Sequence, residues 1–83
     1  EVKKWGKLVS VYISYYAAST GRVTLATNLP LCATPFAYGT CIKSTSYTTT
    51  QNIVTISWDE ITLDVKEGNT GQMEISLLYM TML

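Results

Sequence analysis

The clearest pattern in the chain is the alternation of aliphatic and polar residues between positions 52 and 65. It continues on both sides of a short interruption, Trp58-Asp59-Glu60. A period of two is typical of strands that bury one face and expose the other, so this stretch predicts a β-hairpin. The face expected to pack on the core carries Val54, Ile56, Trp58, Ile61, Leu63 and Val65.

The rest of the chain is rich in the same β-branched and aromatic residues. Further strands are expected over residues 2–5, 8–16, 22–27, 36–43 and 72–83. Gly6 is expected to form a kink or bulge, and Gly39 weakens the strand around it. Residues 67–71, with two glycines and an asparagine, predict a turn. This order predicts an all-β fold, a small antiparallel β-sandwich or jelly-roll-like barrel of about six to eight short strands.

The last expected strand becomes apolar on both faces toward its end. A strand that is apolar on both faces is usually covered on both, and in so short a chain the second cover is expected to be another subunit. The strand over residues 8–16 has a mixed face of Tyr and Ser that is expected to be partly covered in the same way. The residues expected at an oligomer interface are Leu78, Met80, Met82, Tyr12 and Tyr16.

Length and composition support one small domain that depends on partners. The 83 residues predict a single domain over positions 1–83. Apolar residues make up 47% of the chain and charged residues 14%, which is a low charge density for a soluble monomer. The chain begins at Glu1 without a methionine and ends inside an apolar run, so we expect it to be the C-terminal fragment of a longer chain.

The charges and cysteines narrow the possible partners. The formal net charge is zero, which argues against binding of nucleic acid through its phosphates. No apolar run approaches the roughly 20 residues of a membrane span, so membrane insertion is not expected. Basic residues concentrate in the first half and acidic ones in the second, and we expect them to meet across paired strands. For Cys32 and Cys41, two buried free thiols are favoured over a disulfide.

Residue types for catalysis are scarce. The chain has no histidine, so a Ser-His-Asp triad or a Cys/His zinc site cannot be built. Asp59 and Glu60 are adjacent, so on a strand they would face opposite ways and could not flank one glycosidic bond. A calcium site from Asp59, Glu60 and Asp64 is a lesser alternative, because the spacing of an EF-hand loop is missing. We therefore expect no catalytic residues, no metal and no cofactor.

Aromatic residues suggest a binding surface instead. The chain has six tyrosines, two tryptophans and one phenylalanine. Such rings suit packing in a core or interface, and they also suit stacking on sugars. Trp58 lies beside Asp59 at a polar hairpin tip, where ring and carboxylate could contact one ligand. The candidate ligand-binding residues are Trp58, Asp59, Glu60, Tyr47 and Tyr38.

The order of these features resembles a known family. The matching segments are Trp5-Gly6-Lys7-Leu8-Val9-Ser10-Val11, Asn28-Leu29-Pro30 followed by Pro35, residues 53–63 through Trp58-Asp59-Glu60, and a closing strand with Tyr79. In this order the chain resembles the C-terminal head domains of bacteriophage tail-fibre and receptor-binding proteins. It differs from them at Lys7, where Asn is common, and at the hairpin tip, which lacks the usual glycine.

The resemblance implies a non-catalytic β-sandwich or jelly-roll-like head, assembled as a homotrimer at the tip of a fibre. Its function would be host adhesion through a cell-surface saccharide. It would be located in the virion, after assembly in the host cytoplasm. One alternative is a purely structural virion or fibre-assembly module that binds only protein. Another is a bacterial surface adhesin domain, in which Cys32 and Cys41 would be oxidised.

Overall fold

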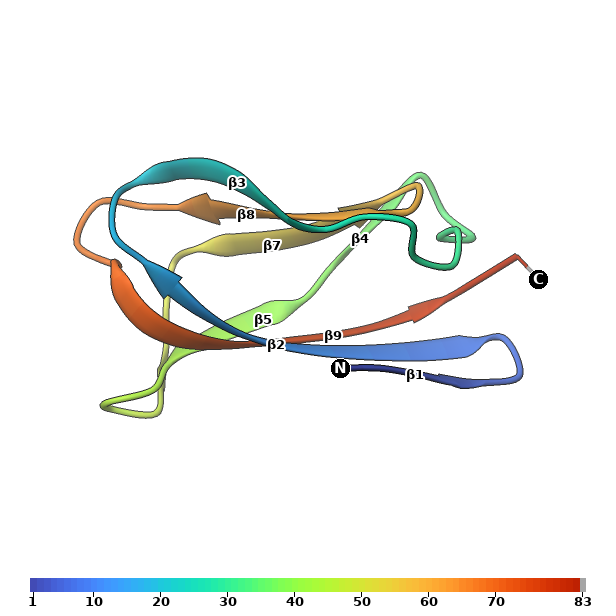
Figure 1. Cartoon of the computed structure of the whole chain (residues 1–83), viewed down its shortest axis with the longest axis horizontal. Coiled ribbons are helices and arrows are strands. Elements are labelled where there is room, and N and C mark those ends of the chain that lie inside the picture. Colours follow the sequence, from blue (N-terminus) through green and yellow to red (C-terminus); the bar gives the residue numbers. More distant parts are fainter. Residues whose placement is uncertain (83) are drawn as a thin grey trace.

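The computed structural model describes residues 1–82, which form nine β-strands in two stacked antiparallel sheets (Figure 1). Sheet A has the order β1 (Val2–Trp5), β2 (Leu8–Ala17), β9 (Gly71–Met80), β5 (Thr40–Lys43) and β6 (Thr48–Thr49). Sheet B has the order β3 (Gly21–Ala26), β8 (Glu60–Val65), β7 (Ile53–Ser57) and β4 (Phe36–Tyr38). The predicted all-β sandwich is confirmed.

The long pair β2–β9 forms the centre of sheet A. All ten residues of β2 pair with β9, from Leu8 opposite Met80 to Ala17 opposite Gly71. Val9 and Val11 of β2 and Ile75 and Leu77 of β9 are buried between the sheets. Because side chains alternate along a strand, the residues between them face outward from sheet A.

The hairpin β7–β8 forms the centre of sheet B, and most of its predicted core is confirmed. The buried residues of the hairpin are Val54, Ile56, Ile61, Leu63 and Val65. Trp58 was expected on the same face, but its side chain is 74% exposed. Because Ser57 pairs with Glu60, Trp58 and Asp59 form a two-residue turn and Glu60 already belongs to β8. The predicted three-residue tip is therefore wrong.

Gly6 also forms a turn, so the predicted kink or bulge is wrong. Trp5 pairs with Leu8, which leaves Gly6 and Lys7 as the turn of the β1–β2 hairpin. Gly6 has a φ of 60°, a value that a two-residue type II′ turn requires at its first position. Trp58 has a φ of 57° at the same position of the β7–β8 turn, where glycine is usual.

The strand expected over residues 36–43 is divided at Gly39. Its first part, β4, pairs with β7 in sheet B, and its second part, β5, pairs with β9 in sheet A. The Gly39 amide donates to the Val54 carbonyl at 2.9 Å as the chain crosses. A Cβ atom at position 39 would lie 2.5 Å from the Ser76 carbonyl oxygen, so the crossing fits only glycine. This division, with the short β6, raises the number of strands above the expected range.

The core between the sheets includes both cysteines and one buried amide. Cys32 and Cys41 are free and buried, which confirms the favoured thiol prediction. Asn52 is also buried. Its Oδ1 accepts a hydrogen bond from the Lys66 amide at 2.8 Å, and its Nδ2 donates to the Asn69 carbonyl at 2.9 Å. These bonds join the start of β7 to the β8–β9 turn, residues 66–70, which overlaps the turn predicted over residues 67–71. No helix among residues 1–82 has the length and apolar character that crossing a membrane requires.

Candidate functional site

The outer face of sheet B carries a groove of about 550 Å³. Its lining comes from all four strands of the sheet: Arg22, Phe36, Tyr38, Ile53, Thr55, Ser57, Glu60, Thr62 and Asp64. These residues alternate along β7 and β8 with the buried core residues. The alternation that builds the core therefore also places this polar and aromatic set on the opposite face.

The antiparallel register aligns the lining residues in three rows across the strands. The rows are Phe36–Ser57–Glu60, Tyr38–Thr55–Thr62 and Ile53–Asp64–Arg22. Neighbouring strands lie about 4.8 Å apart, so β4 and β8 are separated by about 9.5 Å. The groove thus has an aromatic side on β4 and a hydroxyl and carboxylate side on β8.

The aromatic side consists of Phe36 and Tyr38. Their ring centroids are 5.4 Å apart with an interplanar angle of 68°, an edge-to-face arrangement. Phe36 is 51% exposed and Tyr38 63% exposed, so both rings present apolar surface to solvent. An aromatic pair of this kind can pack on a flat apolar face while the Tyr38 hydroxyl remains free for polar contacts.

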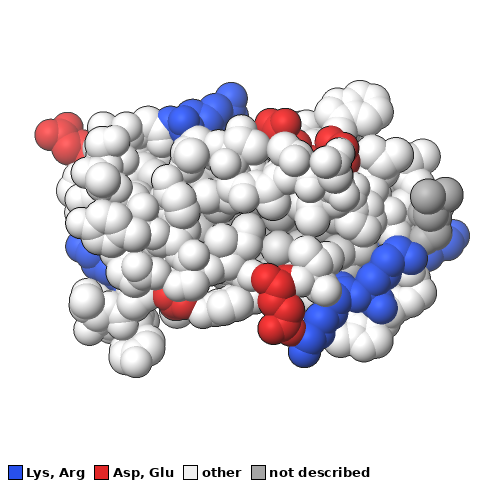
Figure 2. Space-filling view, in the orientation of Figure 1, with Lys and Arg blue, Asp and Glu red and all other residues white. Residues whose placement is uncertain are grey.

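Charge is distributed unevenly along the groove. Register places Arg22 opposite Asp64, as expected for cations and anions from the two halves of the chain. Lys66 also pairs with Asp64, with 2.8 Å between Nζ and Oδ2. Within residues 1–82 no cation lies within ion-pair distance of Glu60. Figure 2 shows both basic and acidic atoms along the upper edge, where sheet B lies in Figure 1.

The structure brings together two of the five predicted ligand residues, Tyr38 and Glu60, on this face. Trp58 instead lines an apolar crevice of about 310 Å³ with Pro35 and Met82. Tyr47 lies in the β5–β6 turn of sheet A and is exposed. The predicted combination of Trp58 with the carboxylates of the hairpin is therefore not assembled in the groove.

The hairpin tip is nevertheless held in place by the chain that follows β3. The Leu29 amide donates to the Asp59 carbonyl at 3.0 Å, and the Cys32 amide donates to the Trp58 carbonyl at 2.8 Å. Asp59 and Trp58 therefore have restrained backbones, although Trp58 exposes most of its ring.

Among residues 1–82 no group of three or more Asp, Glu, His or Cys side chains could hold a metal, so the calcium alternative is not assembled.

Several lining residues were missed by the sequence reasoning. The alternation places Thr55 and Ser57 on the face opposite the core, but this face was not predicted to be a binding surface. Arg22 and Phe36 reach the groove only because β3 and β4 pair with the hairpin. The available signal was the run of hydroxyl and charged residues at alternate positions of both hairpin strands.

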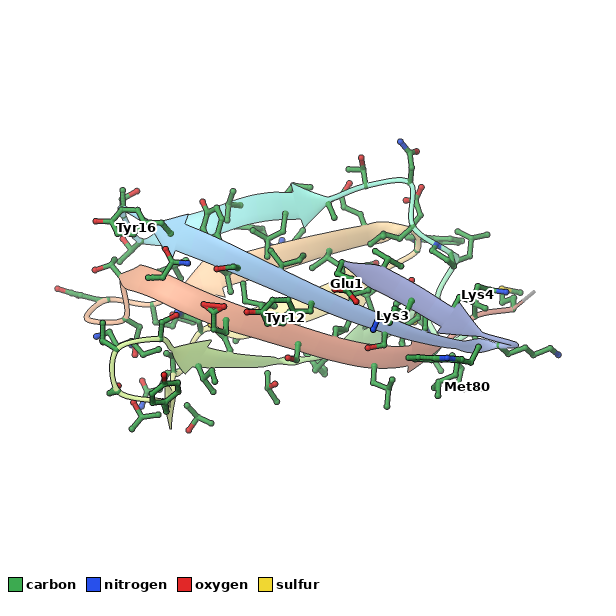
Figure 3. The ribbon with its side chains drawn as sticks, turned by 60° about the horizontal axis from the view of Figure 1, so that its bottom comes forward. Glu1, Lys3, Lys4, Tyr12, Tyr16 and Met80 are labelled. Carbon is green, nitrogen blue, oxygen red and sulfur yellow. The ribbon has the colours of Figure 1, made fainter. Side chains whose placement is uncertain are left out.

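The outer face of sheet A is different in character. Tyr12 and Tyr16 of β2 and Leu78 and Met80 of β9 share this face with Trp5 of β1 (Figure 3). These five side chains are between 45% and 64% exposed in the isolated chain. Four of the five predicted interface residues thus share this face, although the β2–β9 register places Leu78 and Met80 toward one end of it and Tyr16, opposite Gln72, at the other. Met82 lies beyond the end of β9, in the crevice beside Trp58.

The same face has a polar end around Glu74. The Glu74 carboxylate accepts hydrogen bonds from the hydroxyls of Ser44, at 2.5 Å, Tyr12 and Ser14, at 3.2 Å. The Ser44 bond is the largest cause, and the Tyr12 bond the next, of a pKa of Glu74 below its ordinary value. The bond to Glu74 in turn raises the pKa of Tyr12.

Comparison of the chain with protein-family models, with curated proteins and with solved structures finds no match. The resemblance to phage tail-fibre heads therefore stays a prediction from the sequence. The functional argument below rests on the groove of sheet B and on the apolar outer face of sheet A.

Proposed function

We propose that this protein is a non-catalytic adhesion head that binds a host-surface saccharide in the groove of sheet B. The observation that carries the proposal is the exposed Phe36–Tyr38 pair facing a ladder of hydroxyls and carboxylates. A sugar ring has apolar faces and polar edges. It would stack on the rings of β4 while Thr55 and Thr62 exchange hydrogen bonds with its hydroxyls.

The dimensions of the groove favour more than one sugar unit. Glu60 and Asp64 are four residues apart on β8, which corresponds to about 13 Å along the strand. The groove is also open to solvent along the outer face of the sheet. These features suit a linear or terminal segment of a longer glycan better than an enclosed small molecule.

The same spacing supports a binding role without catalysis. Glycosidases place two carboxyl groups about 5–9.5 Å apart around the scissile bond. The backbones of Glu60 and Asp64 are further apart, and the Asp64 carboxylate is engaged by Lys66. We therefore propose that both acids act as hydrogen-bond acceptors for a ligand.

The proposal includes assembly through the outer face of sheet A. A homotrimer that covers Leu78, Met80 and the nearby Tyr12 would remove apolar surface from water. It would also present three copies of the groove, so weak single sites would act with higher avidity. This arrangement corresponds to the tip of a tail fibre in a virion.

A purely structural fibre-assembly module is the second candidate, because the apolar face of sheet A would serve it equally well.

Substitution of Tyr38 tests the saccharide site. We expect Tyr38→Ala to weaken binding to a responsive glycan on an array about tenfold, because a stacking surface is lost. Tyr47→Ala is the matched control, since Tyr47 is also exposed to solvent but lies on the other sheet. Equal binding by wild type and Tyr38→Ala would contradict the proposed site. Absence of any glycan response, together with capture of a fibre component, would support the structural alternative.

A further inference from the structure

The two ends of the sheet B groove differ in charge. One end of the groove is the row Ile53–Asp64–Arg22. There, Asp64 pairs with Lys66 and faces Arg22, so this end carries a surplus of positive charge. At the opposite end, Glu60 has no cation within ion-pair distance among residues 1–82. The end nearest the β7–β8 turn therefore offers a free carboxylate to a ligand.

The neighbours of Glu60 complete a set of groups that suits an ammonium ion. Ser57 lies between Glu60 and Phe36 in the first row of the groove. The Ser57 hydroxyl donates to the Pro35 carbonyl at 3.5 Å, which leaves its oxygen free to accept a hydrogen bond. A carboxylate, a hydroxyl oxygen and an exposed aromatic ring are each attractive to a positively charged amine.

We infer that the saccharide unit bound in this row, beside Glu60, is an amino sugar with a free, protonated amine. This inference rests on the proposed saccharide-binding function and specifies its ligand. The amine would donate hydrogen bonds to the Glu60 carboxylate and the Ser57 oxygen and lie near the Phe36 ring. An anionic sugar in this row would meet a like charge, and an acetylated amine would lose the ion pair.

The inference is tested with three disaccharides of equal length. They are a β-1,4-linked glucosamine disaccharide, its N,N′-diacetylated form and cellobiose, titrated by calorimetry or by NMR shifts. At about pH 6 the amines are protonated, and we expect the glucosamine disaccharide to bind about five- to tenfold more tightly than the other two. The preference should decrease at higher salt, because exposed charges are screened.

Glu60→Gln identifies the residue responsible. We expect this variant to lose the preference for the free amine, so that the glucosamine disaccharide binds no more tightly than cellobiose. Glu67→Gln is the matched control, because it removes the same charge from the β8–β9 turn, outside the groove. Retention of the preference in Glu60→Gln would overturn the inference.

The outcomes separate this inference from the proposed function. If cellobiose and the glucosamine disaccharide bind equally well and both are lost in Tyr38→Ala, the amino-sugar inference is wrong and the saccharide function stands. If none of the three disaccharides binds and a glycan array is also silent, both fail together.

Discussion

Glu74 shows how a single half-buried carboxylate organises the polar end of sheet A. It accepts hydrogen bonds from three hydroxyls on two segments: Tyr12 and Ser14 on β2 and Ser44 after β5. These bonds favour the ionised form, which is why the pKa of Glu74 is lowered. The carboxylate thus links β2, β9 and the β5–β6 turn on one surface.

This lowered pKa predicts a pH dependence of stability. A carboxylate with a depressed pKa in the folded state contributes stability above its ordinary pKa, and this contribution is lost as pH falls through the folded value. We expect the free energy of unfolding of Glu74→Gln to fall less than that of the wild type between neutral and acidic pH. Urea unfolding across this pH range measures the difference. Glu67→Gln should retain the dependence of the wild type, and identical profiles for Glu74→Gln and wild type would contradict the role of the network.

Trp58 shows where a residue-level pattern stops being informative. Alternation along β7 assigns it to the buried face with Val54 and Ile56. Its positive φ in the two-residue turn takes the chain out of the strand before the side chain reaches the core. No glycine or asparagine at positions 58 and 59 signals this backbone conformation, so the exposure of Trp58 could not be predicted.

At the scale of elements, the β7–β8 hairpin could be predicted because its pairing is local. Its two strands are adjacent in sequence, and their alternating patterns agree on one buried face. The segment over residues 36–43 could not be resolved in this way. Its pattern is compatible with one strand, and only the requirement to pair with both β7 and β9 divides it at Gly39.

The close contact at Gly39 predicts a large effect of a small substitution. In Gly39→Ala the added methyl group would meet the Ser76 carbonyl oxygen at 2.5 Å and a Leu77 methyl group at 2.7 Å. We expect the free energy of unfolding to fall by about 3 kcal/mol, because the backbone must shift to relieve the overlap. Thermal unfolding should show a melting temperature lower by more than about 10 °C.

Gly68→Ala provides a matched comparison. Gly68 has a φ of 81°, and a Cβ atom there would meet nothing within 4 Å. Its substitution should cost only about 1 kcal/mol, through backbone conformation alone. Equal losses in the two variants would show that the crossing at Gly39 can adapt.

The candidate site was partly predictable for the same reason as the fold. Tyr38 and Glu60 were selected as an exposed ring and a carboxylate near a hairpin. Phe36 and Arg22 enter the groove from strands that join the hairpin only in the folded sheet. A binding face built across four strands has no contiguous motif, so its membership follows from strand pairing and not from spacing along the chain.

At the scale of the whole molecule, the two outer faces divide the surface between them. Sheet B presents hydroxyls, carboxylates and the Phe36–Tyr38 pair, whereas sheet A presents Leu78, Met80 and Trp5 beside a polar end. Contiguous exposed apolar surface on a small protein commonly marks an interaction site. The proposed division is therefore ligand binding on one face and subunit assembly on the other.

A charge on the apolar face tests this division. We expect Leu78→Lys to convert the trimer expected for the wild type into a monomer, because an unpaired ammonium would be buried at the interface. Light scattering at micromolar concentration measures the mass, and circular dichroism should show an unchanged fold. Thr24→Lys, on the outer face of sheet B, should leave the trimer intact. A monomeric wild type would contradict assembly through sheet A.

The crossing at Gly39 has a mechanical consequence. Tyr38 belongs to sheet B and Thr40 to sheet A, although only one residue separates them. A pull on a molecule held in the groove would pass from Tyr38 through covalent bonds into β5. There, four register pairs with β9 would take up the force. Hydrogen bonds of an antiparallel ladder run across the strands, so tension along β5 loads them in shear and together. Tension would thus travel from one sheet to the other through the backbone and not through the side chains packed between them.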